Sequence, residues 1–353
     1  MSVFSISGIR VSGVSACVPK QPFHNKDYDW LNEKERSNLI KTIGVESKRH
    51  VRRGVTSADL CFAAADKLLD ELEWKRDEID LLIFVSQTRD YLMPATACIL
   101  QERLGLSDDC MAFDLDLGCS GYVYGLSVIN SMLNAAHLKK ALLLTGEIPS
   151  PNISYKDKST FPLFGDAGAA TALEYNPEKA SQAFFNLQTS GKGYRAIHIP
   201  DGGMRNFPTA DSFKEEEISE GIIRNRFQIA LDGMAVFNFT ITRVRPNIEE
   251  LLKHYNIPKQ EIDYFVFHQA NKLLNETIRK QLKVDAEKYP YSINHFGNTS
   301  SASIPLTIVT AIRDEIRQKH LRLLLSGFGV GLSWGSCILD TDRIVCPDLI
   351  EID

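Results

Sequence analysis

The sequence predicts an α/β protein made of two copies of one structural unit. Three pairs of similar segments occur in the same order along the chain, at a nearly constant separation of about 180 residues. Each copy combines apolar runs bounded by charges, which are typical of buried strands, with segments of helical periodicity. Chance similarity would not readily keep both the order and the separation. The pairs are residues 77–87 with 260–269, the segment around Cys119 with 291–300, and 142–146 with 323–327.

Length and composition agree with this organisation. The 353 residues are enough for two domains, 1–178 and 179–353, whose connection we expect between residues 176 and 183. A hydrophobic content of 44% and a charged content of 24% are those of a globular protein with a large core. The net charge of -5 argues against a general affinity for nucleic acid or for an anionic membrane.

Targeting signals and metal-binding patterns are not evident. No apolar run is long enough to cross a bilayer, and the first ten residues lack the basic leader and apolar core of a signal peptide. The seven cysteines are scattered, and none forms a C-x-x-C pair. This pattern suggests neither a disulfide framework nor a metal site. We therefore expect a reduced, cytoplasmic protein.

The first half alternates predicted strands and helices. Its strands are apolar runs or alternate apolar with polar residues, whereas a helix with one apolar stripe can be capped by Thr56 or Ser57. Pro94 is suited to the start of another helix, and Gly105 to its end. In order, we expect a strand at 5–14, a short helix within 25–53 that precedes residues 42–44, a helix through Leu72, a strand at 79–85 and a helix at 94–104.

The segment around Cys119 is predicted to be a strand, a tight corner and a helix. Residues 113–117 form the strand, Gly118 the corner, and the apolar residues after Cys119 a helix that is buried on most sides. A cysteine in the first turn of a helix faces unpaired N–H groups and the positive end of the helix dipole. This setting favours the thiolate, which is the nucleophilic form. The alternative is a small apolar residue at a crowded corner.

The second half repeats the same order of elements. A strand is expected to end at His268, and a strand, corner and helix are expected at 291–300, with Asn298 at the start of the helix. Each half then has another strand, which starts near 141 in the first half. A glycine-rich turn follows in each, at 164–168 and at 328–331.

Two polar excursions interrupt the repeated pattern, at 148–162 and at 200–226. The second contains the acidic run 215–217, which favours a solvated surface loop. The alternative is a flap over a substrate entrance, because loops of this length often act as lids.

Packing of the two halves about a pseudo-twofold axis would bring Cys119, His268 and Asn298 to one cleft. A thiolate can take up an acyl group, and two neutral donors can stabilise the developing oxyanion. Taken singly, a histidine at a strand end and an asparagine in a turn are ordinary polar residues. Their matched positions in the repeat indicate acyl transfer.

Four short motifs are distinctive in their residues and in their spacing. They are Leu-Gly-Cys-Ser-Gly at 117–121, Phe-His-Gln-Ala-Asn at 267–271, Gly-Asn-Thr-Ser-Ser-Ala-Ser-Ile-Pro at 297–305 and Gly-Phe-Gly-Val-Gly-Leu-Ser-Trp-Gly at 327–335. The four motifs stand in the order and spacing of the β-ketoacyl-[acyl-carrier-protein] synthase III family, which the chain resembles over essentially its whole length. The resemblance implies the thiolase-like fold, a five-layer α/β/α/β/α arrangement of two duplicated halves, and a homodimer.

The resemblance also implies a role for each motif residue. Cys119 is the acylated nucleophile, and backbone N–H groups of Cys119 and Val330 form the oxyanion hole. His268 and Asn298 donate hydrogen bonds to a malonyl thioester while it loses carbon dioxide. The carbanion then attacks the acyl group and yields a β-ketoacyl thioester. Acyl carrier protein is the implied partner, and the cycle needs no metal and no redox cofactor.

Basic residues after His268 are candidates for binding that partner. Lys272, Arg279 and Lys280 lie on the helix expected there and could meet an acidic carrier protein. The alternative is a solvated helix face without a partner.

Departures from the family's pattern favour a specialised paralogue. The family holds coenzyme A with a tryptophan and two arginines, and residues 38–44 and the loop 148–161 lack them. This favours a primer that is carried by acyl carrier protein, although acyl-coenzyme A stays a second possible donor. Met93 stands where the family often has an aromatic residue that reaches the acyl pocket from the partner subunit. The alternative is that Met93 only packs in the interface between the subunits. Phe237, expected at the same pocket, is followed by Asn238 where the family has a lysine.

Two alternative functions follow from the same residues. An acyltransferase of this fold would pass the acyl group from Cys119 to an amine or hydroxyl, with His268 as general base. The intact Asn298 argues against it, because the enolate most needs that donor. A non-catalytic partner subunit or carrier-binding module is disfavoured by the complete set of three side chains.

Overall fold

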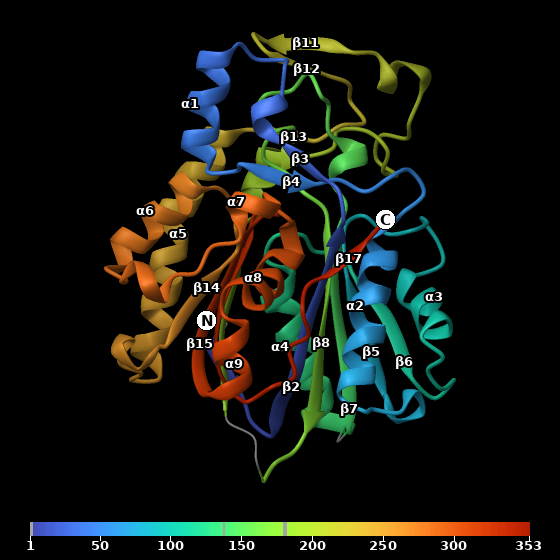
Figure 1. The fold of residues 1–353 in the computed structure, drawn as a ribbon, viewed down its shortest axis with the longest axis vertical. Helices are drawn as coiled ribbons and strands as arrows, with labels where there is room; N and C mark the ends of the chain where they lie inside the picture. The colour runs from blue at the N-terminus through green and yellow to red at the C-terminus, as the bar shows by residue number, and fades with distance from the viewer. Residues whose placement is uncertain (1–2, 137, 179–181) are drawn as a thin grey trace.

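The computed structural model describes residues 3–136, 138–178 and 182–353, which form two stacked β-sheets (Figure 1). The first half supplies most of a six-stranded sheet, and the second half most of a five-stranded sheet. In spatial order the larger sheet comprises β17 (Ile350–Ile352), β2 (Ile9–Pro19), β8 (Ala167–Tyr175), β7 (Lys140–Glu147), β5 (Leu81–Val85) and β6 (Met111–Leu115). The smaller sheet comprises β1 (Val3–Ile6), β9 (Ala183–Thr189), β16 (Ser333–Asp342), β15 (His320–Gly329) and β14 (Tyr264–Phe267).

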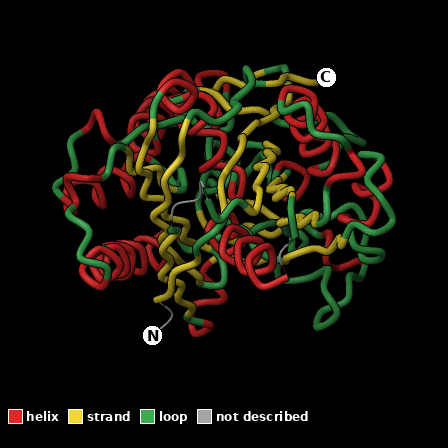
Figure 2. The backbone as a smooth tube through the Cα atoms, turned by 90° about the horizontal axis from the view of Figure 1, so that it is seen from below, coloured by secondary structure: helices red, strands yellow, loops and turns green. Residues whose placement is uncertain are grey.

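Helices lie between the two sheets and on their outer faces (Figures 1 and 2). The order is the expected five-layer α/β/α/β/α arrangement, which is confirmed. Between the sheets lie α4 (Gly121–Ala136) and α8 (Ser303–Ala311), followed by the short α9 (Arg313–Gln318). The outer helices are α2 (Ser57–Glu71) and α3 (Thr96–Arg103) on the larger sheet, and α5 (Gly233–His254) and α6 (Lys272–Leu282) on the smaller one.

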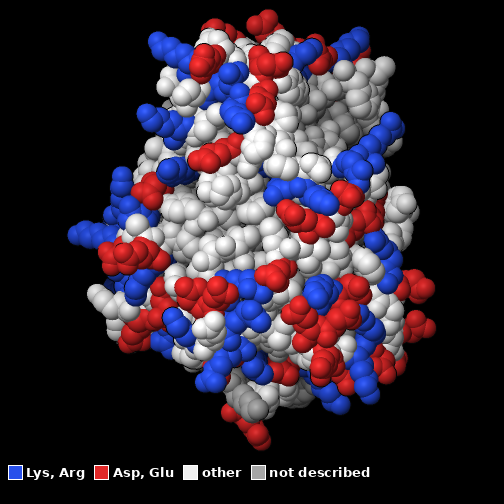
Figure 3. Space-filling model, viewed as in Figure 1, with Lys and Arg blue, Asp and Glu red and all other residues white. Residues whose placement is uncertain are grey.

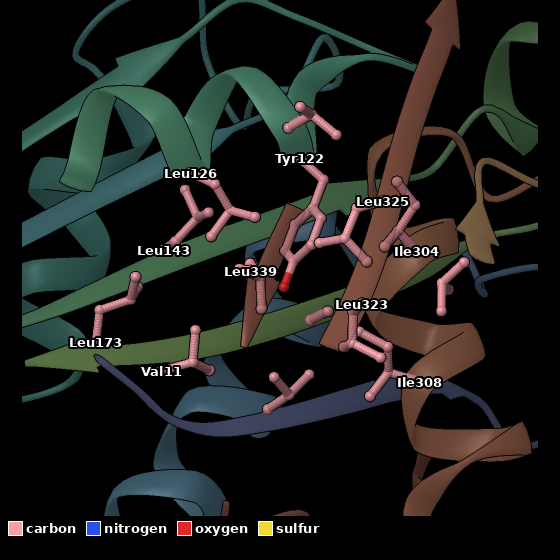
Figure 4. Close-up of a cluster of buried hydrophobic side chains, with 14 of the residues drawn as sticks. Val11, Tyr122, Leu126, Leu143, Leu173, Ile304, Ile308, Leu323, Leu325 and Leu339 are labelled. Carbon is pink, nitrogen blue, oxygen red and sulfur yellow. The ribbon is translucent and has the colours of Figure 1, made fainter. Parts of the chain in front are cut away.

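The central helices form the core that joins the two halves (Figure 4). Tyr122 and Leu126 from α4 pack in one cluster with Ile304 from α8, Leu143 from β7 and Leu325 from β15. Each fully buried leucine or isoleucine of this kind contributes about 2 kcal/mol to stability. A helix between two sheets has no broad face toward solvent, which explains the lack of charges in α4.

Capping residues set where two of the predicted helices begin. The Asp59 N–H donates to Thr56 Oγ1 at 3.3 Å, and the Thr56 N–H donates to the Asp59 carboxylate at 2.8 Å. This capping box starts α2, and Asn32 starts α1 (Glu33–Ile43) in the same way. Gly44 ends α1 with a φ of +76°, so this helix extends into the segment 42–44 that it was expected to precede.

Two boundaries in the first half differ from the predicted ones. The single strand expected at 5–14 is two strands, because the chain bends at Gly8, where φ is +85°, and β1 pairs with β9 of the other sheet. The helix expected from Pro94 begins only at Thr96. The N–H groups of Thr96 and the next residue donate to the Asp114 carboxylate at 2.8 and 2.7 Å, so the cap comes from β6.

The strand expected within 291–300 is wrong. This segment forms the short helix α7 (Ile293–Phe296), and Asn298 lies in the loop before α8 rather than at its start. Its backbone forms a hydrogen bond with a different part of the chain: the Glu46 N–H, just before β4 (Ser47–Arg49), donates to the Asn294 carbonyl at 2.9 Å. Among the described residues the smaller sheet therefore has no counterpart of β6.

The two polar excursions pack against each other at one end of the molecule, where β11 (Glu216–Ser219) and β12 (Ile222–Arg224) lie in Figure 1. Arg224 donates to the Asp157 carboxylate at 3.0 Å, and Lys156 pairs with Glu215 at 2.7 Å. Asp157 is fully buried. The run 215–217 is exposed, so the solvated interpretation of these charges is confirmed. The remaining short strands pair as β3 (Pro22–His24) with β4 (Ser47–Arg49), β10 (Ile197–His198) with β13 (Ala230–Leu231), and β11 (Glu216–Ser219) with β12 (Ile222–Arg224).

The terminal strands are exchanged between the two halves. β1 joins the sheet of the second half, and β17 pairs with β2 in the sheet of the first half. The domain boundary between 178 and 179 stays a prediction, because residue 179 lies outside the described residues. Within the described ranges, none of the helices has both the length and the apolar character needed to cross a membrane.

Candidate active site

A cavity of about 360 Å³ contains side chains from both halves of the chain. Cys119, His268 and Asn298 all line it, together with Ser300 and Val330. Its size falls within the range of sites for small molecules. The structure therefore brings together the three side chains that the internal repeat was expected to place in one cleft. Apolar residues supply much of the remaining wall: Pro149, Leu163, Phe164, Ile197, Ile199, Ile229, Leu231 and Phe328.

Cys119 lies at the corner between β6 and α4 and is 6% exposed. The Ser300 hydroxyl donates to its sulfur at 3.8 Å, and the Val330 N–H also bonds to it. Gly329 passes close by with a φ of +153°, and a Cβ at this position would lie 2.8 Å from the sulfur. Only glycine allows the chain to approach the nucleophile in this way.

The protonation state of Cys119 differs from the prediction. The helix start was expected to favour the thiolate, but burial raises the pKa of the Cys119 thiol. Hydrogen bonds from Val330, from Ser300 and from its own N–H lower this pKa only in part. Desolvation outweighs them because the sulfur lies in a cavity with largely apolar walls. The thiol form therefore prevails before the reaction.

His268 directly follows β14, at the end of the predicted strand. Its Nδ1 lies 2.8 Å from Ser303 Oγ, and its ring meets the Phe328 ring edge-on with centroids 5.5 Å apart. Burial lowers the pKa of His268 to about 4, with the Ser300 carbonyl acting in the opposite direction. The imidazole is therefore neutral near neutral pH and can act as a hydrogen-bond donor.

Asn298 is held by its backbone and by its side chain. Its N–H donates to the Leu163 carbonyl at 2.8 Å, and its carbonyl accepts from the Gly165 N–H at 3.1 Å. Its Oδ1 accepts from the Ser300 N–H at 3.0 Å, which fixes the orientation of the amide. The Nδ2 donates to the Ala270 carbonyl at 3.3 Å and keeps a second N–H.

Two residues assigned to the acyl pocket lie away from the cavity within this chain. Met93 is 83% exposed and does not line the cavity. Phe237 is half-buried and packs with the cluster between α5 and the smaller sheet, while its neighbour Val236 reaches the cavity.

The basic residues of α6 are not equally available. Lys272 and Lys280 are exposed, but Arg279 is partly buried. Its guanidinium donates to the Glu276 carboxylate at 3.0 and 2.8 Å and to the Val284 carbonyl at 2.8 Å. Because its charge is already paired, Arg279 is less available to an acidic carrier than Lys272 and Lys280, and all three assignments stay predictions.

Sequence reasoning missed three ionisable groups that line the cavity, Asp116, Glu147 and His198. Of these, Glu147 at the end of β7 is buried. Its carboxyl accepts hydrogen bonds from the Gln87 N–H and from Thr88 Oγ1, both at 2.9 Å. Burial raises the pKa of Glu147 to about 8, and these hydrogen bonds act in the opposite direction. A lone acidic residue at the end of an otherwise apolar strand was the signal that could have revealed it.

Glu147→Gln is expected to remove the loss of folding stability that the wild type undergoes as pH rises. The folded protein keeps this proton up to about pH 8, whereas an ordinary glutamic acid releases it near pH 4.5, so wild-type stability falls as pH rises between these values. The amide has no proton to lose, so the stability of the variant relative to the wild type should rise by about 4 to 5 kcal/mol over that range. Urea unfolding at about pH 5 and about pH 9 measures the difference.

The exposed Glu102 provides the control for this prediction. Glu102→Gln removes the same charge from the surface, and its difference from the wild type should not change with pH in this way. An equal response of the two variants would contradict a buried, protonated carboxyl at Glu147.

Comparison with known proteins agrees with the geometry. Residues 113–193 match the family described as 3-Oxoacyl-[acyl-carrier-protein (ACP)] synthase III, and residues 252–341 match its C-terminal part. The β-ketoacyl-[acyl-carrier-protein] synthase III of Clostridium tetani is 32% identical over 333 residues, which are 94% of this chain and 98% of the relative. The crystal structure of a 3-oxoacyl-(acyl-carrier protein) synthase from Burkholderia xenovorans has a TM-score of 0.93 and 37% identity, covering 99% of both chains. The chain therefore belongs to the β-ketoacyl-[acyl-carrier-protein] synthase III family of condensing enzymes.

Proposed function

We propose that the protein acylates Cys119 from an acyl thioester and then condenses the acyl group with malonyl-[acyl-carrier protein]. One observation carries the proposal: a thiol, a neutral imidazole and a fixed carboxamide line the same cavity. Together they provide a nucleophile and two donors for the two steps.

Acylation begins with attack of the Cys119 sulfur on the thioester carbonyl carbon. The developing oxyanion accepts hydrogen bonds from the N–H groups of Cys119 and Val330, which the sulfur itself engages in the free enzyme. The thiol proton passes to solvent as the sulfur attacks, the bond between the carbonyl carbon and the donor sulfur breaks, and the leaving donor thiolate takes up a proton from solvent. No other group has to keep that proton.

Condensation follows when the malonyl group loses carbon dioxide. The bond between its carboxylate and its methylene breaks, and the electron pair forms an enolate whose oxygen accepts hydrogen bonds from His268 and Asn298. For this donation the proton of the neutral imidazole is on Nε2, and the Ser303 hydroxyl turns from the Ser300 carbonyl to Nδ1, each of which lies 2.8 Å from Ser303 Oγ. The methylene carbon attacks the acyl carbon, the bond to Cys119 breaks, and the thiolate regains a proton from solvent.

The low pKa of His268, about 4, disfavours the alternative of acyl transfer to an amine or hydroxyl. A general base works best when its pKa lies near the working pH. A hydrogen-bond donor has no such requirement, and neutrality suits it.

The acting form is proposed to be a homodimer in the cytoplasm. Tyr91, Leu92 and Met93 form a run that is 61%, 63% and 83% exposed, and β6 is an unpaired sheet edge among the described strands. Exposed apolar runs and free strand edges usually need cover. A second copy would provide it and could bring its Met93 toward the cavity.

Acyl carrier protein is the proposed partner, as donor of the malonyl group and, by the departures noted above, of the primer. Lys272 and Lys280 are exposed on α6 and could meet an acidic carrier. Basic and acidic side chains alternate along the edge of the molecule that α6 occupies (Figure 3), so such contacts would be local.

Release of carbon dioxide tests the proposed reaction. The protein is incubated with an acyl thioester and malonyl-[acyl-carrier protein] carrying a radiolabelled carboxyl group. Labelled carbon dioxide and a β-ketoacyl product are expected. An acyl adduct on Cys119 without carbon dioxide release would instead support transfer to another acceptor. A panel of coenzyme A and carrier-protein thioesters, followed by intact mass spectrometry, identifies the primer.

A further inference from the structure

Ser300 contacts all three groups of the proposed site. Its hydroxyl donates to the Cys119 sulfur at 3.8 Å, and its N–H donates to Asn298 Oδ1 at 3.0 Å. Its carbonyl accepts from Ser303 Oγ at 2.8 Å, and the same oxygen of Ser303 lies 2.8 Å from His268 Nδ1. Among the described residues, no other makes hydrogen bonds that reach all three groups in this way.

The backbone of Ser300 takes a costly conformation to make these contacts. Its φ is +49°, in the left-handed region that residues other than glycine rarely adopt. Such conformations persist only where the surrounding structure imposes them, and they concentrate at functional sites. Here the conformation turns the N–H toward Asn298 and the hydroxyl toward the sulfur.

We propose that Ser300 is a further catalytic residue, whose hydroxyl stabilises the Cys119 thiolate whenever the sulfur carries charge. The inference rests on the proposed role of Cys119 as nucleophile. The sulfur is anionic at two points of the cycle, when it attacks the primer and when it leaves the acyl carbon. The hydroxyl keeps its own proton throughout and only donates a hydrogen bond.

The low hydration of the cavity makes this hydrogen bond important for the stability of the thiolate. The sulfur is buried, so few water molecules are available to solvate its negative charge. A hydrogen bond to an ionised acceptor is about twice as strong as one between neutral groups. An acylated sulfur is a poor acceptor, so the hydroxyl stabilises the thiolate more than the acyl-enzyme and assists both its formation and its release.

The hydroxyl can be removed without the backbone contacts. Ser300→Ala keeps the N–H that orients Asn298 and the carbonyl that accepts from Ser303. The next residue, Ser301, offers a matched control. It is also buried, and its hydroxyl has no hydrogen-bond partner in the structure. Ser301→Ala therefore removes the same group one position away from the sulfur.

Alkylation of Cys119 by iodoacetamide, followed by mass spectrometry over a range of pH, measures the thiolate directly. Ser300→Ala is expected to move the pH profile of Cys119 alkylation toward alkaline pH by about one pH unit. At neutral pH the alkylation rate should therefore be about tenfold lower. Ser301→Ala should leave it unchanged, and the exposed Cys98 serves as internal reference. The other ionisable groups that line the cavity, Asp116, Glu147, His198 and His268, are the same in all variants.

An unchanged Cys119 profile in Ser300→Ala would overturn the proposal, as would an equal shift in Ser301→Ala. If the alanine variant does not fold, Ser300→Gly also removes the hydroxyl and relieves the left-handed backbone, and the same shift is expected. The assay uses no acyl substrate. A shifted profile without carbon dioxide release in the condensation assay would therefore uphold the role of Ser300 and reject the proposed reaction.

Discussion

Cys119→Ala is expected to abolish the acyl adduct and to lower the rate of β-ketoacyl product formation by about 10⁴-fold or more. The methyl group cannot attack a thioester, and the described residues place no second thiol in the cavity. Intact mass spectrometry after incubation with acyl thioesters measures the adduct, and product formation from malonyl-[acyl-carrier protein] measures the rate.

The exposed Cys98 is the control for non-specific acylation of thiols. Cys98→Ala should leave both the adduct and the rate unchanged. If Cys119→Ala formed the product at the wild-type rate, a covalent intermediate on this sulfur could not be part of the reaction.

Asn298→Asp is expected to slow condensation by about 10²- to 10³-fold, the usual cost of removing one oxyanion donor. The carboxylate keeps an oxygen to accept from the Ser300 N–H, so the backbone of the site should be preserved. It loses the N–H donor, however, and places a negative charge beside the enolate. Carbon dioxide release should fall, whereas the acyl adduct on Cys119 should still form.

Asn271→Asp provides a matched control for the added charge. Asn271 also lines the cavity, and its side chain caps α6 by accepting from the Leu274 N–H at 2.8 Å. Aspartate caps a helix equally well, so the fold should be kept. A loss of carbon dioxide release as large as that of Asn298→Asp would assign the effect to charge in the cavity rather than to the missing donor.

Much of the fold could be predicted because local patterns and the internal repeat agree. The apolar runs of β5 and β7 and the uncharged α4 have the composition that a position between buried layers requires. The repeat wrongly predicted a counterpart of β6 within 291–300, where the chain forms α7. The short apolar stretch near Ile293 suits a strand as well as a helix, and the partner that decides is the segment before β4, remote in sequence.

The site was predictable where it depends on the ends of elements, and not where it depends on burial. Cys119 and His268 follow strands, and the repeat predicted that they approach each other. The pKa of the thiol instead depends on desolvation by segments far along the chain, such as the turn at Gly329. For Arg279 a local signal existed, because Glu276 stands three residues before it on the same helix face.

The buried pair between Arg224 and Asp157 constrains how this scaffold can be diversified. Each charge comes from a different excursion, and the carboxylate is fully shielded from water. A chimaera that took only the segment of Arg224 from a relative without this arginine would leave the carboxylate without its cation, at a cost of about 3 to 5 kcal/mol. Grafts intended to change primer preference should therefore transplant both segments together, and natural recombination is expected to inherit them as one block.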